Sequence, residues 1–256
     1  MGFEDGWDSL ATLVDGEWVE RRPRRAEVAG QLRREARVMP WLAPLLPLAV
    51  PVPWVAGEEP LVVRHALVRG NALEGGGFGE GAAVGAFLRA LHGCPVAEAV
   101  RRGLPGAEET RRDRVETLGR FRSEVLPLVP VDVRAAAGAM LDTAAATPAD
   151  TVVHGDLGPE HVLVDDGRVS GVIDFGDAHV GDAAIDLAWA LFGAPEAFAE
   201  GVASAYGVTD DVRRRALTWH QLGPWYEVTY GLDTGDAESV RSGLAGLLDR
   251  LTAGIA

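Results

Sequence analysis

The densest group of potentially catalytic side chains lies in the segment 153–177. His154, Asp156 and His161 follow one short apolar run, and Asp174 follows another after a hairpin signal. Because a hairpin returns the chain beside its start, we expect Asp156, His161 and Asp174 to converge on one side of two strands. A carboxylate that can accept a hydroxyl proton, beside groups that can hold Mg²⁺ on nucleotide phosphates, is a layout for phosphoryl transfer.

Two linked motifs carry a family resemblance. HGDLGPEH at 154–161, followed by VIDFGDAHVGDAAIDLA at 172–188, resembles the catalytic and metal-binding motifs of the aminoglycoside phosphotransferase family, which includes macrolide and choline kinases. The resemblance covers nearly the whole chain. It implies an α+β, two-lobed protein-kinase-like fold, with a small β-rich N-lobe at 1–68 that binds nucleotide. A larger, mostly helical C-lobe at 69–256 would carry the catalytic loop and the substrate-binding helices.

The same resemblance assigns roles within these motifs. Asp156 would be the catalytic base, His161 and Asp174 would be Mg²⁺ ligands, and His154 would brace the catalytic loop. His161 stands where the family usually has Asn, a substitution that resembles the macrolide kinases and the aminoglycoside 2″-kinases. Because Mg²⁺ prefers oxygen donors, His161 could instead bond a metal-bound water.

Nucleotide-binding candidates lie in the first 70 residues. Gly6-Trp7-Asp8-Ser9 resembles the family's opening turn over the nucleotide, which makes Ser9 a candidate. The stretch 18–25 resembles the strand that supplies the phosphate-binding Lys or Arg. This chain has no lysine, so Arg21 is the candidate, with Glu35 on the next helix as its ion-pair partner. The nucleotide base is expected to bond the backbone of three consecutive residues, His65, Ala66 and Leu67.

The acceptor candidates come from the helical C-terminal part. Asp186, Trp225 and Glu227 combine carboxylates with an aromatic ring, which suits a cationic or glycosylated ligand. Residues 141–256 contain 6 arginines and 19 acidic residues, a net charge of −13 within a total of −14. This excess either steers a cationic substrate toward the site or forms an acidic surface that favours solubility. Composition alone does not separate the two interpretations.

The elements that must position these residues are indicated by hydrophobic periodicity. Short strands at 9–14 and 17–22 meet at Asp15-Gly16, a pair typical of a type I′ turn. A glycine-rich crossing at 70–81 separates the β-rich start from a mostly helical remainder. Further strands are predicted at 61–68, 151–153, 162–164 and 169–173. Helices are predicted at 26–42, from 82 onward, and at 108–125, 133–146, 183–191, 196–206, 212–230 and 238–251.

Composition excludes several classes of protein. The net charge of −14 over 256 residues opposes binding to a phosphate backbone, so no nucleic-acid partner is expected. The apolar run 39–57 holds five prolines and cannot be a continuous membrane helix. Cys94 is the single cysteine, which excludes an intrachain disulfide and favours the cytoplasm. We expect a monomer that binds a small-molecule substrate and no membrane.

The residues and the resemblance together predict an ATP- or GTP-dependent, Mg²⁺-dependent O-phosphotransferase. Its acceptor would be a hydroxyl of a small cationic molecule, foremost an antibiotic such as a macrolide or an aminoglycoside. A metabolite kinase for an amino alcohol or sugar is an alternative. So is a metal-dependent hydrolase, since the three histidines and three of the aspartates in 154–179 could form a dinuclear metal site: His154, Asp156, His161, Asp174, Asp177 and His179. The missing lysine and the unusual His161 leave room for a catalytically weak nucleotide-binding module.

Overall fold

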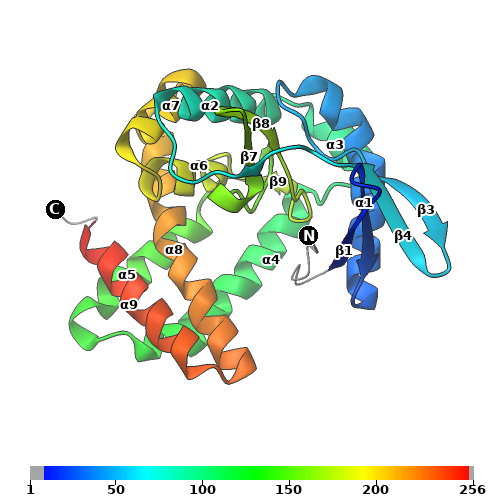
Figure 1. Cartoon of the computed structure of the whole chain (residues 1–256). Coiled ribbons are helices and arrows are strands. Elements are labelled where there is room, and N and C mark those ends of the chain that lie inside the picture. The colour runs from blue at the N-terminus through cyan, green and yellow to red at the C-terminus, as the bar shows by residue number, and fades with distance from the viewer. Residues whose placement is uncertain (1–8, 254–256) are drawn as a thin grey trace.

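The computed structural model describes residues 9–253, and a small β-rich part precedes a mostly helical part (Figure 1). The first part is an antiparallel sheet with strand order β1-β2-β4-β3. Asp15 and Gly16 join its first two strands with φ of 53° and 70°, as a type I′ turn requires. The third strand was not predicted, because it follows the proline-rich run. The strands are β1 (Ser9–Val14), β2 (Trp18–Pro23), β3 (Trp54–Glu58) and β4 (Leu61–Ala66).

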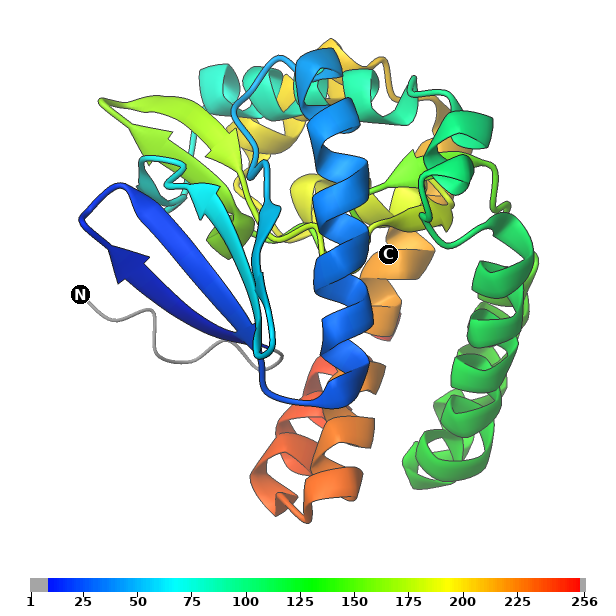
Figure 2. The ribbon, with the colours of Figure 1, turned by 90° about the vertical axis from the view of Figure 1, so that its right-hand side faces the viewer.

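Helix α1 (Ala26–Leu42) lies along this sheet and has the predicted bounds (Figure 2). Its Val28 and Leu32 pack against Leu61 and Val63 of β4, and these four side chains form a separate small core. Apolar residues spaced by four bury one face of the helix. The same packing directs the side chains of Gln31 and Glu35 on α1 toward the loop that contains residue 176 and toward β2.

Two small sheets carry the candidate catalytic segments. β5 (Asn71–Ala72), β7 (Val162–Asp165) and β8 (Arg168–Val172) form one sheet, in the order β5-β7-β8. β6 (Thr151–Val153) pairs antiparallel with β9 (His179–Gly181), a strand that the sequence did not predict. The HGD segment therefore leaves β6 and enters β7, while the Asp174 segment leaves β8 and enters β9. Two hairpin-like returns place these two loops side by side.

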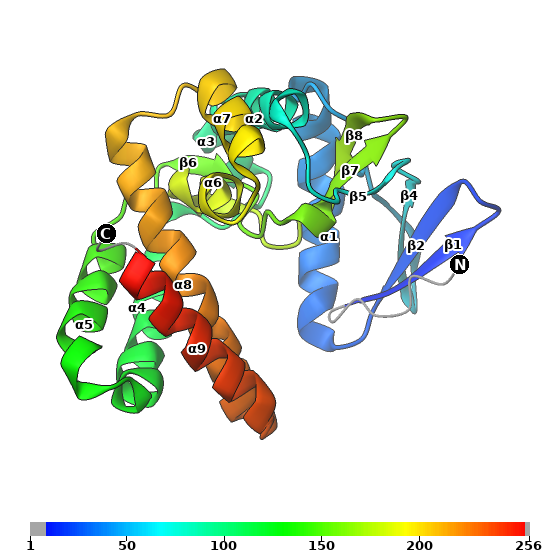
Figure 3. The ribbon, with the colours of Figure 1, turned by 60° about the vertical axis from the view of Figure 1, so that its left-hand side comes forward.

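Some helices of the second part contact these sheets, and the C-terminal helices extend away from them (Figure 3). α2 and α7 approach closely, because a Cβ at Gly81 would collide with the carbonyl of Phe198, and one at Gly201 with the carbonyl of Phe78. A π-helical turn over Phe121–Val125 continues α4, and α3 was not predicted. No helix within residues 9–253 is both long and apolar enough to cross a membrane. The helices are α2 (Phe78–His92), α3 (Val96–Arg101), α4 (Ala107–Arg120), α5 (Val131–Ala145), α6 (Ala184–Phe192), α7 (Glu196–Tyr206), α8 (Asp210–Thr234) and α9 (Ala237–Ala253).

Candidate active site

The structure brings Asp156, His161 and Asp174 together. His161 sits at the end of a 3₁₀ turn, Pro159–His161, with Nδ1 4.0 Å from Asp156 Oδ2 and Nε2 3.8 Å from Asp174 Oδ2. The Asp156 side chain is 63% exposed, so a substrate hydroxyl can reach it. The His161 ring thus lies between the exposed carboxylate of Asp156 and the carboxylate of Asp174.

The protonation of His161 follows from its partners. Its Nδ1 lies 2.7 Å from the backbone oxygen of Asp156, and a carbonyl can only accept, so Nδ1 carries the proton. In the neutral ring the Nε2 lone pair then faces Asp174 Oδ2. Two acceptors that face each other at 3.8 Å fit a cation or a water between them.

The donor set fits Mg²⁺ in part. Asp174 offers the carboxylate oxygen that this ion prefers, whereas His161 offers a nitrogen, so it would hold the ion directly or through a water. Asp174 also has a φ of 64°, a left-handed conformation that is strained for a non-glycine residue and is common at functional sites. When bound, the ion would neutralise charge on the nucleotide phosphates.

His154 links the loop that contains Asp156 to the loop that contains Asp174. Its fully buried ring bonds the carbonyl of Ile173 through Nε2 at 2.9 Å, and Nδ1 accepts the amide of Asp156 at 3.3 Å. The ring also packs on Phe175, with the centroids 4.7 Å apart. These contacts support the bracing role that the resemblance implied.

Asp186 does not face a substrate. Its carboxylate is fully buried and accepts the amides of His154 at 2.7 Å and Gly155 at 2.9 Å. Burial alone would raise the pKa of Asp186, but the hydrogen bonds from His92 and from the Gly155 amide help to hold it below its usual value. The predicted substrate contact of Asp186 is therefore wrong, because the residue anchors the catalytic loop from inside the protein.

Arg21 connects the sheet, α1 and the Asp174 loop. Its Nη1 donates to Glu35 Oε2 at 2.7 Å and its Nε donates to Ser9 Oγ at 3.1 Å. Its Nη2 lies 3.9 Å from Asp174 Oδ1. The predicted pair of Arg21 and Glu35 is thus in contact, and Ser9 is buried against the same guanidinium. Gly6, Trp7 and Asp8 of the predicted opening turn lie outside the described residues.

Glu35 is a buried carboxylate beside this cation. Burial raises its pKa to about 7; the charge of Arg21 opposes the shift and the charge of Asp174 adds to it. Its Oε1 is buried without a hydrogen-bond partner. The ionised form of the Glu35 carboxyl is therefore stabilised by the neighbouring Arg21 cation.

The predicted base-binding backbone lies at the end of β4. The Leu67 amide already donates to the Glu17 carbonyl at 2.7 Å, and the buried His65 ring bonds the Ala66 carbonyl through Nδ1 at 2.8 Å. Burial lowers the pKa of His65. A base held at this edge must share the Ala66 carbonyl or displace one of these bonds, so the assignment of these three residues stays a prediction.

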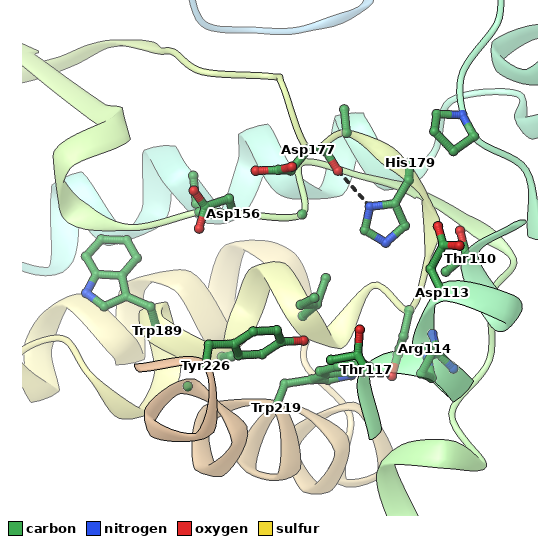
Figure 4. A pocket seen from close by; sticks show the side chains of 18 of the residues that line it. Thr110, Asp113, Arg114, Thr117, Asp156, Asp177, His179, Trp189, Trp219 and Tyr226 are labelled. Atoms are coloured by element: carbon green, nitrogen blue, oxygen red, sulfur yellow. Dashed lines mark hydrogen bonds between the residues drawn. The ribbon is translucent and has the colours of Figure 1, made fainter. Parts of the chain in front are cut away.

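A cavity of about 950 Å³ opens beside Asp156 (Figure 4). Trp189, Trp219 and Tyr226 supply aromatic surface from α6 and α8. Asp182, fully buried at 1% exposure, accepts the Trp219 indole N–H at 3.0 Å and pairs with Arg215, which fixes the orientation of that ring. Exposed carboxylates also line the cavity, those of Glu109, Asp113, Asp156 and Asp177.

Arginines also line the cavity, but two of them are bonded to the protein. Arg114 lies over the Trp219 ring and gives its Nη1 to the Thr147 carbonyl and its Nη2 to the Pro148 carbonyl. Arg250 donates to the His220 carbonyl. Arg34 of α1 lines the cavity from the N-terminal part. The Arg114 guanidinium, beside the α4 carboxylates that face the cavity, thus already has hydrogen-bond partners in the protein.

Two further residues that were predicted to contact the acceptor do not line the cavity. Trp225 is fully buried and packs on Phe121, so its predicted substrate contact is wrong. Glu227 is exposed on α8 but does not line the cavity. Trp219, Gly223 and Tyr226 do line it, and their i, i+4, i+7 spacing is the signal that identifies the correct face of the helix. The contribution of α4 was missed, because its acidic residues read as an ordinary solvated face.

The family is decided by comparison with known proteins. A family model described as the phosphotransferase enzyme family matches residues 1–219. The chain belongs to this family. An aminoglycoside 3′-phosphotransferase from Escherichia coli is 32% identical over 149 residues, which is 55% of this chain and 53% of that protein. The match thus spans about half the length of that curated relative.

Solved structures extend the likeness to the whole fold. A GDP and kanamycin complex of an APH(2″) enzyme superposes with a TM-score of 0.85 at 22% identity, over 99% of this chain and 93% of that one. A macrolide 2′-phosphotransferase of Brachybacterium faecium gives 0.73 at 25%, over 95% and 89%. A type I macrolide 2′-phosphotransferase gives 0.74 at 27%, over 96% and 90%. The predicted two-lobed kinase-like fold is confirmed.

The ligand set of the hydrolase alternative is not assembled. Within residues 9–253, no three His, Cys, Asp or Glu side chains are grouped so that they could hold a metal ion by themselves. His154 is buried and bonded to Ile173, and His179 Nδ1 is bonded to the Asp177 carbonyl. A phosphotransferase needs fewer protein ligands, because nucleotide phosphates complete the coordination of its metal.

Proposed function

We propose that this chain is an NTP- and Mg²⁺-dependent O-phosphotransferase acting on a hydroxyl of a small cationic molecule. The convergence of Asp156, His161 and Asp174 beside Arg21 carries the proposal. Asp156 orients the acceptor hydroxyl and takes its proton, while that oxygen bonds the terminal phosphorus. The bond from this phosphorus to the bridging oxygen breaks, and the nucleoside diphosphate leaves with that oxygen. Arg21 binds the phosphates, and Asp174 with His161 would hold the metal.

The acceptor class is supported by the size and lining of the cavity. A volume of about 950 Å³ suits a drug-sized ligand and exceeds what a small amino alcohol would fill. Aromatic walls beside exposed carboxylates favour an acceptor with both an apolar face and ammonium groups. The relatives named above act on aminoglycosides or macrolides, so we assign the acceptor to these antibiotics.

A nucleoside-diphosphate release screen tests the proposal. The protein is incubated with Mg²⁺ and either ATP or GTP, against aminoglycosides, macrolides, amino alcohols and neutral sugars. We expect release with an antibiotic, a product heavier by one phosphoryl group, and loss of both in Asp156→Asn. Turnover of only an amino alcohol or sugar would point to a metabolite kinase. Nucleotide binding without turnover on any acceptor would point to a binding module.

A further inference from the structure

A line of buried and partly buried hydrogen bonds runs from α7 to the catalytic loop. The Tyr206 hydroxyl on α7 lies 2.9 Å from His92 Nδ1 on α2, and His92 Nε2 lies 3.0 Å from Asp186 Oδ2 on α6. The same carboxylate accepts the amides of His154 and Gly155. Side chains from α2, α6 and α7 thus form a line that ends at the two residues preceding Asp156, although α2 is distant in sequence from the other two helices.

The chemistry of the groups fixes the direction of each bond. A carboxylate that already accepts two amides is ionised, so His92 Nε2 carries the proton that it shares with Asp186. In the neutral ring Nδ1 is then an acceptor, and the Tyr206 hydroxyl donates to it. Burial, with the nearby charge of Asp186, raises the pKa of Tyr206 to about 12, so this hydroxyl keeps its proton. Every donor in the line has one matching acceptor.

The line is shielded from water at His92 and Asp186, is half-buried at Tyr206, and ends at a constrained backbone. The His92 and Asp186 side chains are 5% and 0% exposed, so water does not readily replace a partner lost between these two groups. Gly155 has a φ of 90°, and a Cβ there would collide with the Asp177 carbonyl. The direction in which the chain leaves Gly155 sets where the Asp156 side chain points.

We propose that Tyr206 and His92 are positioning residues for phosphoryl transfer. They hold the Asp186 carboxylate in one orientation, and that carboxylate holds the backbone that aims Asp156. The role rests on the proposed function, because Asp156 is its endpoint. Misplacement of a catalytic group lowers kcat, while nucleotide affinity depends on Arg21 and Asp174 and should not change. If the line only packed α2 on α7, its loss would lower the melting temperature and leave kcat unaltered.

Tyr206→Phe tests the far end of the line, because it removes one oxygen and keeps the ring packed. We expect kcat to fall about threefold to tenfold, the range that follows from the net free energy of one hydrogen bond. Nucleotide Kd should stay at the wild-type value, and amide exchange at 154–156 should quicken. Tyr230→Phe on α8, outside this line, is the matched control and should change neither kcat nor amide exchange at 154–156. Wild-type kcat together with wild-type exchange in Tyr206→Phe would overturn the proposal.

His92 tests the middle of the line through rescue. His92→Gln can still offer an N–H toward Asp186, whereas His92→Ala cannot, so we expect the Gln variant to retain more kcat and slower exchange at 154–156. Equal losses in the two variants would contradict the role. The ¹⁵N shifts of the wild-type His92 ring should show Nε2 protonated. If the wild type turns over no acceptor, the proposed function fails, while amide exchange and ring shifts still decide whether the line holds the loop.

Discussion

Arg21 Nη1 and Glu35 Oε2 meet at 2.7 Å across the boundary between β2 and α1. The same guanidinium also bonds Ser9 and lies 3.9 Å from Asp174. One planar cation therefore links the sheet, the helix and the candidate metal-binding loop. An ammonium on a flexible stem presents a single point charge and cannot reproduce this fork, and this chain contains no lysine.

Arg21→Lys should weaken nucleotide binding although it keeps the charge. The ammonium can pair with Glu35 or approach Asp174, but it cannot also bond Ser9, so we expect Kd for the nucleotide to rise about tenfold. Isothermal titration with ADP and Mg²⁺ measures this. Arg22→Lys is the matched control, because its partner is Glu20 on the outer face of the sheet. Equal affinities in the two variants would show that the fork is not needed.

Glu35 should make the stability of the protein depend on pH. Its pKa of about 7 lies above the ordinary value of 4.5, so the folded protein holds a proton that the unfolded chain releases between these pH values. The free energy of unfolding should therefore fall as pH rises from 4.5 to 7, by at most about 1.4 kcal/mol per pH unit. Urea unfolding of wild type and Glu35→Gln at several pH values measures the difference. Glu27→Gln, exposed on the same helix, should follow the wild type.

Asp156→Asn separates chemistry from binding. The amide keeps the shape of the side chain but cannot accept the hydroxyl proton, so kcat should fall by about 10² or more. Nucleotide Kd should remain within a factor of about two, since Asp156 lies on the acceptor side. Single-turnover kinetics with the acceptor found in the screen measure kcat, and titration measures Kd. Near-normal turnover would remove Asp156 from the role of base.

The sequence predicted the catalytic end of this protein better than its acceptor end. Asp156, His161 and Asp174 are tied to short strands and a hairpin, so local pairing is enough to bring them together. Arg21 and Glu35 could be paired because one lies on a strand and the other on the helix that covers it. In both cases the contact follows from elements adjacent in sequence.

The acceptor cavity depends on packing between distant helices. Whether Trp225 or Tyr226 faces the cavity is set by the rotation of α8 against α4 and α6. The i, i+4, i+7 spacing groups Tyr226 with Trp219 on one face of the helix, and tertiary packing turns that face to the cavity. The burial of Asp186 likewise results from α2, α6 and the catalytic loop meeting in three dimensions. Aromatic and acidic composition predicted the kind of site, but tertiary contacts choose its residues.

Substitutions of the two candidate metal ligands should have unequal effects on nucleotide binding. Asp174→Ala should abolish Mg²⁺-dependent nucleotide binding, because it removes the carboxylate that would carry the ion. His161→Asn should keep most of it, since an amide oxygen is a donor that Mg²⁺ accepts more readily than imidazole nitrogen. Nucleotide titrations with and without Mg²⁺ compare the two. If both variants lose the Mg²⁺ dependence equally, His161 contributes something that an amide cannot supply.

The acidic residues of α4 should decide the affinity for a cationic acceptor. Glu109 and Asp113 line the cavity, whereas Glu108 is exposed on the same helix outside it, and Glu227 is exposed on α8 outside it. Glu109→Gln and Asp113→Asn should each raise acceptor KM several-fold and leave nucleotide KM unchanged. Glu108→Gln and Glu227→Gln should change neither. A rise in acceptor KM in all four variants would instead point to the general negative field of the C-terminal part.

Salt distinguishes contact from steering in the same variants. The Debye length shortens from about 30 Å at 0.01 M to about 8 Å at 0.15 M, so long-range attraction should weaken while a charge pair within the cavity persists. If the net charge of −13 over residues 141–256 steers the acceptor, wild-type kcat/KM should fall with salt. The defect of Asp113→Asn relative to wild type should then remain at 0.15 M, because the ammonium and the carboxylate meet inside the cavity. A defect that vanishes at 0.15 M would place Asp113 in the field rather than in the site. A wild-type kcat/KM that does not change with salt would favour a neutral acceptor. The acidic residues would then form a surface that favours solubility.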